Sequence, residues 1–148
     1  MSDAGVVRLL IFRVGHLLCA TEAERVREIL PRLAATRIPG APAVVAGLVN
    51  VRGTLVTVVE GWRALRQPEP AASDVDGTTV LLEVDGGKVL GFTVDEVVDL
   101  LAVGGDALES RQALPGIDPT LVRAVGRRAG QLFVVLDTDA LLNPILSS

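Results

Sequence analysis

The chain has 148 residues, of which 49% are hydrophobic and 22% are charged, a composition typical of one folded globular domain rather than a disordered chain. Its formal net charge is −4, which argues against non-specific nucleic-acid binding, because neutralising phosphates requires clustered Lys and Arg side chains. The chain contains three Phe, one Trp and no Tyr, which leaves few aromatic rings on which nucleic-acid bases can stack. Its abundant aliphatic side chains favour a β-rich core.

The charges are unevenly distributed along the chain. Residues 1–66 carry nine Arg against five acidic residues, a balance of +4, and residues 67–148 carry five basic against thirteen acidic residues, a balance of −8. One interpretation is chance together with solvated loops. The other is a protein with two surfaces of opposite sign that meet different partners.

Cysteine usage and hydropathy indicate the compartment. The single cysteine, Cys19, excludes an internal disulfide and a cysteine metal cluster. The first residues, MSDAGVVRLLIFRVG, lack the basic region and the small-residue cleavage site of a signal peptide, and no apolar run reaches the ~18 residues of a membrane span. We therefore expect a cytoplasmic protein that does not insert directly into a membrane.

The beginning of the chain predicts a hairpin followed by a helix. VVRLLIFRV (6–14) has the pattern of a strand, and LLCA (17–20) that of its partner. Thr21 is placed to cap a short helix over TEAERVREIL, with Glu24 three residues later completing a capping box. Pro31 ends this helix, because proline has no backbone N–H to continue it.

Two further strands and a linker follow. Residues 36–43, TRIPGAPA, predict a rigid loop. Residues 44–51 and 54–60 predict strands that are joined by a tight turn at Arg52–Gly53. The segment PEPAASDVDG (68–77) is the clearest linker, rich in Pro, Ala and acidic residues.

The second half predicts two hairpins around an irregular segment. TTVLLEVDGGKVLGFTVDEV turns at residues 85–87, VVDLLAV (97–103) forms another strand, and residues 104–120 are irregular. The second hairpin turns at residues 127–130, and ALLN forms a short helix that ends at Pro144. The whole chain thus predicts about eight to ten short strands at intervals of roughly 8–12 residues, which favours small antiparallel barrels or a sandwich over a βαβ fold.

No set of residues assembles an enzyme site. A metal site requires several ligands at fixed spacing, and the chain has one histidine, His16, at a predicted turn. Cys19 lies between Leu and Ala, which favours a core residue over a thiolate nucleophile. Asp137 and Asp139 are placed to cap the terminal helix. We expect no catalysis, metal or cofactor; an enzyme would require a fold that joins Cys19, His16 and an acidic side chain.

The stretch AGLVNVRGTLVTVV (46–59) places two polar residues inside an apolar, strand-like run. For Asn50, two interpretations stay open: it satisfies backbone groups at the strand end, or it binds a partner. Gly53 supplies the positive φ of a turn. For Arg52 we favour a binding role, because a guanidinium has a fork of donors suited to a carboxylate, such as that of Glu28, or to a partner helix.

Several motifs together resemble the CheW-like family of chemotaxis coupling proteins. The resemblance runs from residue 8 to residue 142 and includes LLIFRVG with CATEAERVREIL, RIPGAPAVVAGLVNVRGTLVTVVE, TVLLEVDGGKVLGFTVDEVVDLL and GQLFVVLDTDALL. Its most specific pieces are Val26 with Glu28-Ile29, Pro39-x-x-Pro42, Gly47, Asn50-x-Arg52-Gly53 and Val94-Asp95 after Gly91. The chain departs from the family pattern at Ala124, where glycine is common.

The resemblance implies a mainly β fold, with two small five-stranded SH3-like barrels packed together and short helices, in a single CheW-like domain over residues 1–148. It also implies intertwined subdomains, which a cut at the 68–77 linker would not separate. The implied function is a non-catalytic cytoplasmic adaptor, which couples chemoreceptor cytoplasmic tips in membrane-bound arrays to the regulatory domain of a CheA-type histidine kinase.

The resemblance further implies two binding surfaces. The receptor-binding groove would be formed by Val26, Glu28, Asn50, Arg52, Val80, Gly91 and Leu100. For Val26, Val80 and Leu100, plain core packing is the alternative interpretation. Gly47 would lie at the kinase interface, where a side chain would obstruct the approach of another barrel. A second functional hypothesis is a small-ligand sensor that uses the groove between the barrels as a pocket.

Overall fold

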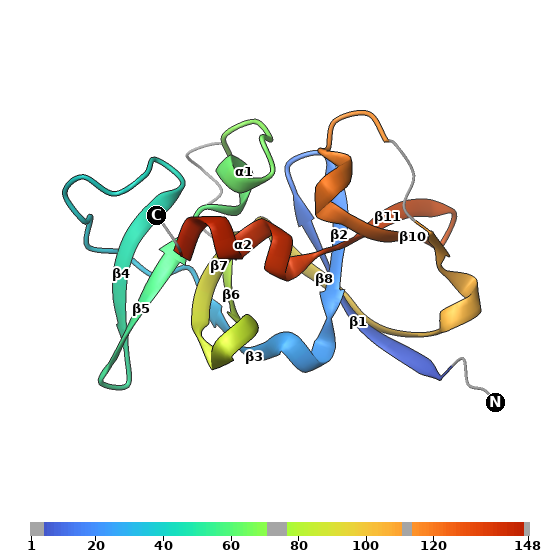
Figure 1. The fold of residues 1–148 in the computed structure, drawn as a ribbon, viewed down its shortest axis with the longest axis horizontal. Coiled ribbons are helices and arrows are strands. Elements are labelled where there is room, and N and C mark those ends of the chain that lie inside the picture. Colours follow the sequence, from blue (N-terminus) through green and yellow to red (C-terminus); the bar gives the residue numbers. More distant parts are fainter. Residues whose placement is uncertain (1–4, 71–76, 111–113, 147–148) are drawn as a thin grey trace.

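The computed structural model of the chain describes residues 5–70, 77–110 and 114–146. Its strands form two sheets, which lie side by side in Figure 1. The first has the order β8 (Glu96–Gly104), β1 (Val6–Val14), β2 (Leu17–Glu22), β11 (Gln131–Leu136), β10 (Val122–Arg128) and β9 (Glu109–Ser110). The second has the order β3 (Val26–Pro31), β6 (Thr78–Glu83), β7 (Val89–Val94), β5 (Thr54–Val59) and β4 (Val45–Val51).

The predicted mainly β fold with two small subdomains and short helices is confirmed, with one difference in detail. One sheet has six strands rather than five, and the strand pairing leaves each sheet open rather than closed into a barrel. The helices are α1 (Gly61–Ala64) and α2 (Thr138–Leu146), together with short 3-10 turns that include η1 (Ala23–Arg25) and η4 (Pro119–Leu121).

The two sheets repeat one arrangement of strands. The order β3-β6-β7-β5-β4 corresponds to β8-β1-β2-β11-β10, with β9 added at the end. Each contains one parallel pair at the same place, β5 with β7 and β2 with β11. A register shift lies between Val26 and Glu28 in β3 and between Val97 and Asp99 in β8. The structure is therefore two copies of one motif, and α1 and α2 each follow the corresponding strand, β5 or β11.

The chain crosses between the sheets twice. Strands β1 and β2 come from the N-terminus but pair with β8 and β11 from the C-terminal half, whereas β3 to β7 form the other sheet. The predicted linker 68–77 thus falls inside the second sheet's sequence, between β5 and β6, and residues 71–76 of it lie outside the described residues. A cut there would split a sheet rather than divide the molecule into its two halves.

A single large apolar cluster fills the space between the sheets. It includes buried side chains from β1, β6, β7, β10, β11 and α2. Phe12 of β1 meets Phe92 of β7 edge to face, with ring centroids 6.1 Å apart. Two smaller clusters lie within the individual sheets, one around Phe133 and one around Val56. Burying a Phe or Leu side chain stabilises a fold by about 1.5–3 kcal/mol, so the shared cluster fixes the two sheets against each other.

The helix predicted after Thr21 is wrong. Thr21 is a buried member of β2, only Ala23–Arg25 forms a 3-10 turn, and Val26–Pro31 is the strand β3. β3 pairs with β6 in antiparallel register, from Val26 with Leu82 to Pro31 with Thr78. Capping preferences contribute about 0.5–2 kcal/mol, and the ladder of backbone hydrogen bonds with β6 outweighs them.

The C-terminal helix is longer than predicted, and only one of its two expected caps is confirmed. It spans Thr138–Leu146 and contains Pro144, and the short helix α1 is absent from the prediction. Asp137 does cap α2, because its Oδ1 accepts the Ala140 N–H at 3.1 Å. Asp139 instead binds Arg25.

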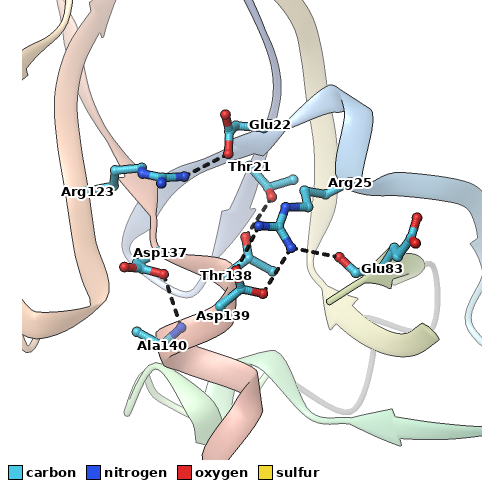
Figure 2. Close-up of polar contacts among 9 residues, drawn as sticks. All are labelled: Thr21, Glu22, Arg25, Glu83, Arg123, Asp137, Thr138, Asp139 and Ala140. Atoms are coloured by element: carbon cyan, nitrogen blue, oxygen red, sulfur yellow. Dashed lines mark hydrogen bonds and ion pairs between the residues drawn. The ribbon is translucent and has the colours of Figure 1, made fainter. Parts of the chain in front are cut away.

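Arg25 joins three separate elements of the fold (Figure 2). Its guanidinium donates from Nη1 and Nη2 to the two carboxylate oxygens of Asp139 in α2, at 2.9 and 2.7 Å. Nη1 also donates to the backbone carbonyl of Glu83 at the end of β6, at 3.2 Å. Beside it, the buried hydroxyls of Thr21 and Thr138 lie 3.0 Å apart. These contacts hold α2 against both sheets.

A glycine in β4 allows the loop that follows β3 to pack closely against this strand. Gly47 is buried, and a Cβ at this position would lie 2.2 Å from the carbonyl oxygen of Thr36 and 3.1 Å from Cα of Arg37. Thr36 and Leu48 exchange two backbone hydrogen bonds of 2.8 Å. The close approach that requires glycine is therefore made by the chain's own backbone, whereas the resemblance implied a second protein.

Replacing Arg25 with Met is expected to lower the free energy of unfolding by about 1–3 kcal/mol, because the Asp139 carboxylate and the Glu83 carbonyl lose charge-assisted hydrogen bonds in a partly buried site. Urea denaturation measures the change. Arg123→Met is the control, because Arg123 makes one exposed ion pair with Glu22 and its loss is expected to change stability by less than about 0.5 kcal/mol. Equal effects of the two variants would show that Arg25 does not join the elements as described.

Gly47→Ala is expected to lower the melting temperature by about 5 °C or more, because the new methyl group collides with the Thr36 backbone and the loop must move. Gly40→Ala separates this collision from backbone strain: Gly40 also has a positive φ, +79°, but a Cβ there meets no atom within 4 Å. Differential scanning calorimetry on both variants measures the difference. If the melting temperature of Gly47→Ala is equal to or higher than that of Gly40→Ala, the predicted collision is contradicted.

Candidate functional site

The stretch that carries Asn50 and Arg52 forms the β4–β5 hairpin. Arg52 and Gly53 are the two turn residues, with φ of +50° and +88°, and Val51 pairs with Thr54 on either side. Two positive φ values in a two-residue turn are typical of a type I′ hairpin. The Gly53 N–H donates to Oδ1 of Asn50 at 2.7 Å, so the local structural interpretation of Asn50 is confirmed.

Arg52 extends from this turn to the other edge strand of the same sheet. Its guanidinium forms a two-point ion pair with Glu28 on β3, with Nη1 3.0 Å from Oε2 and Nη2 against Oε1. The hydrogen bond from Arg52 lowers the pKa of Glu28, and the same bond raises the pKa of Arg52. The expected partner carboxylate is therefore confirmed. The pair connects β3 to the tip of the hairpin at the sheet's open side, where β3 and β4 are the two edges.

Two residues of the expected groove are not on the surface. Val80 is 1% exposed and belongs to the shared core, so the core-packing interpretation holds for it. Gly91 is also buried, and a Cβ there would lie 3.0 Å from Thr79 Cγ2 and 3.1 Å from Val58 Cγ2. Neither residue can line a groove in this structure, because neighbouring strands cover them. Val26 is half-buried and packs against the shared core.

Leu100 is exposed, and two further apolar residues that the sequence analysis missed are exposed as well. Leu100 on β8 is 63% exposed, which excludes core packing for its side chain. Ile29, which follows Glu28, is 46% exposed, and Leu55, which pairs with Asn50, is 67% exposed. The sequence TLVTVV does not alternate between apolar and polar residues, so nothing in it distinguishes exposed Leu55 from its buried neighbour Val56.

The other sheet carries a corresponding group of residues, with an ion pair and exposed aliphatic side chains. Asp99 accepts a hydrogen bond of 3.0 Å from Nε of Arg128, which precedes the β10–β11 turn. This bond is the main cause that lowers the pKa of Asp99. By the strand correspondence, Asp99 is the counterpart of Glu28 and Leu100 that of Ile29, and exposed Leu132 takes the place of Leu55. The molecule thus presents two similar groups, each with an ion pair and exposed aliphatic side chains.

The residues considered for catalysis do not form a reactive site. Cys19 is buried in the shared core, and this burial raises its thiol pKa to about 12. It is therefore protonated and poorly nucleophilic at neutral pH. His16 lies at the β1–β2 turn, where its backbone N–H donates to Oε1 of Gln67 at 3.1 Å.

Neither a cluster of metal-ligating side chains nor a membrane-spanning helix is found in the part of the chain that the structure describes. No three His, Cys, Asp or Glu side chains among residues 5–70, 77–110 and 114–146 gather in a way that would hold a metal ion. Within the same residues, no helix combines the length and the apolarity needed to cross a bilayer.

Known proteins resemble this chain along nearly all of its length. "Chemotaxis protein CheW" of Treponema pallidum is 27% identical over 140 residues, which cover 92% of this chain and 82% of that protein. The protein of the same name from Rhizobium meliloti is 27% identical and covers 89% of this chain and 84% of its own length. That of Bacillus subtilis is 23% identical, with coverage of 92% and 86%.

A solved structure has the same fold. The scaffolding protein TtCheW from Thermoanaerobacter tengcongensis superposes with a TM-score of 0.84 and covers 93% of each chain, at 19% sequence identity. At this identity the superposition establishes the fold alone. The profile of the CheW-like domain matches residues 8–145, and this range includes every strand in the two sheets apart from the first two residues of β1. The chain therefore belongs to the CheW-like domain family, whose members here are named as chemotaxis and scaffolding proteins.

Proposed function

We propose that this protein is a non-catalytic adaptor that couples the cytoplasmic tips of chemoreceptors to the regulatory domain of a CheA-type histidine kinase. The observation that carries the proposal is the match of the CheW-like domain to residues 8–145. An adaptor needs two separate surfaces and a rigid body between them. The core shared by both sheets supplies such a body. The protein would work in the cytoplasm, recruited to receptor arrays at the membrane.

The surface proposed for the receptor includes the Glu28–Arg52 ion pair, with Val26 and Leu100 as its apolar members. Asn50 contributes by holding the turn that carries Arg52, and buried Val80 and Gly91 contribute by supporting the strands beneath. Receptor tips are helical, and an amphipathic helix would place apolar side chains on Val26 and Leu100 and a carboxylate near Arg52. The Arg52 side chain is 70% exposed, so donors remain accessible beside the bond to Glu28.

The surface proposed for the kinase is the loop 36–43, which packs against Gly47. Gly47 itself is buried, but it fixes Thr36 and Arg37, whose side chains are exposed. The kinase domain would therefore contact the loop 36–43 rather than Gly47 directly. Arg37 is the basic residue of this loop, and together with the +4 balance of residues 1–66 it favours an acidic surface on the partner.

Arg52→Glu is expected to weaken receptor binding at least about tenfold, because a guanidinium that serves a partner carboxylate is replaced by a like charge. The double variant Glu28→Arg/Arg52→Glu restores an ion pair within the protein but presents the reversed charge. If Arg52 contacts the receptor, the double variant remains weak, and Arg127→Glu, at an exposed site on β10, binds normally. Titration against a receptor tip fragment from the same genome measures all three. Recovery in the double variant would assign Arg52 a structural role only.

Arg37→Glu is expected to weaken binding to the kinase regulatory domain about tenfold and to leave receptor binding unchanged, because the two surfaces are carried by different elements. Titration of the same genome's regulatory domain against wild type, Arg37→Glu and Arg52→Glu measures this separation. Loss of both affinities in both variants would mean that the two partners share one surface. Failure of the wild type to bind the kinase domain would refute the coupling function itself.

A further inference from the structure

A hollow of about 720 Å³ lies on the side of the molecule that carries both helices. Four segments surround it: Val44 just before β4, α1 with the residues just after it, residues 116–121, and α2. Its floor is apolar and includes Leu65, Ile117, Leu121, Leu141 and Ile145. Three of these, Leu65, Ile117 and Leu141, are buried members of the shared core, so the floor is backed by rigid packing.

The polar residues of the hollow carry more positive than negative charge, although the protein as a whole is acidic. Arg63, Arg66 and Asp118 line it. The Asp118 carboxylate is already engaged, because Oδ1 accepts the Thr120 N–H at 2.9 Å and the Thr120 hydroxyl at 2.8 Å. Arg63 donates from Nε to Glu60 at 2.9 Å. Arg66 interacts electrostatically with the Asp118 carboxylate, but among the described residues no carboxylate forms a hydrogen bond with the Arg66 guanidinium.

Arg66 occupies a backbone position that favours glycine. Its φ is +54°, and it follows the last turn of α1. The Gln67 N–H donates to the Trp62 carbonyl at 2.7 Å, and the Arg66 N–H donates to the Arg63 carbonyl at 3.2 Å. This pair of bonds is the Schellman motif, in which the left-handed residue is usually glycine. The other non-glycine residues with positive φ, Arg52 and Ala129, lie in two-residue hairpin turns.

An arginine at this position has a conformational cost that glycine would avoid. Strained residues that persist in a fold are concentrated at binding sites. Despite this cost, the chain has an arginine here, and its guanidinium lies at one end of an apolar hollow. Guanidinium groups bind carboxylates through two parallel hydrogen bonds.

We propose that this hollow binds a small amphipathic monocarboxylate, whose carboxylate pairs with Arg66 and whose apolar body lies on Leu121, Leu141 and Ile145. The volume is within the range of small-molecule sites, roughly 300–1,000 Å³, and such sites combine apolar side chains with polar groups that orient the ligand. The four surrounding segments make a hollow rather than a long groove, which favours a small ligand over a partner helix. The site shares no residue with the surfaces proposed for receptor and kinase, although Val44 at its edge directly follows the loop 36–43, and it goes beyond the adaptor function.

The test uses sodium octanoate as the probe with the full-length protein. Octanoate at about 100 times its dissociation constant is expected to raise the melting temperature of the wild type by about 5 °C. Affinity measured by calorimetry should increase from butanoate to octanoate, because each added methylene lies on the apolar floor. Acetate and 1-octanol, which supply the charge and the chain separately, should each bind at least about tenfold more weakly than octanoate.

Arg66→Gly distinguishes a lost contact from a damaged fold. Without ligand, this variant should melt at or above the wild-type temperature, because glycine adopts the left-handed conformation without strain. Its affinity for octanoate should fall at least about tenfold. Arg127→Gln, which removes an exposed arginine on β10, should bind octanoate as the wild type does. Absence of octanoate binding to the wild type, or equal affinity of wild type and Arg66→Gly, would overturn the proposal.

Discussion

The rest of this structure depends on one apolar cluster that both sheets share. Phe12 and Phe92 meet at its centre, and β1, β6, β7, β10, β11 and α2 all contribute buried side chains. This cluster forms because β1 and β2, the first two strands of the chain, complete the sheet of the C-terminal half. Neither sheet can bury its inner face alone. The ion pairs on the two sheets, Glu28–Arg52 and Asp99–Arg128, are therefore held at a fixed relative position.

Ion pairs close the regions that strand pairing leaves open. Glu28–Arg52 links the edge strand β3 to the β4–β5 turn, and Asp99–Arg128 does the same for β8 and β10. These pairs are largely exposed and serve to orient the chain rather than to stabilise it strongly. Arg25 differs, because it is less exposed and binds Asp139 with two hydrogen bonds while it also binds a backbone carbonyl. It secures α2, and with it one wall of the hollow that Arg66 lines.

The two copies of the strand motif differ in the residue at one corresponding position. Gly47 in β4 corresponds to Ala124 in β10, at the same register shift. Gly47 must be glycine because the backbone of the loop 36–43 approaches it closely. Ala124 instead pairs with Ser110 of the two-residue strand β9 and packs against the cluster around Phe133. A departure from the family pattern at Ala124 therefore has a structural reason. The loop that distinguishes the first copy is the segment proposed to meet the kinase.

Most strands other than β3 and β9, the hairpin turns, the family and the role of Gly53 could be predicted from the sequence, because alternating hydrophobicity and turn residues act over a few positions. The sequence also indicated the Arg52–Glu28 pair, since an arginine beside a turn glycine needs a carboxylate. Only the tertiary structure decided that Val26–Pro31 is a strand, because pairing with β6 outweighs the capping signal at Thr21. The same holds for the burial of Val80 and Gly91, the exposure of Ile29 and Leu55, and the partner of Asp139. Each of these depends on which distant strand or helix lies alongside, and local sequence does not specify that neighbour.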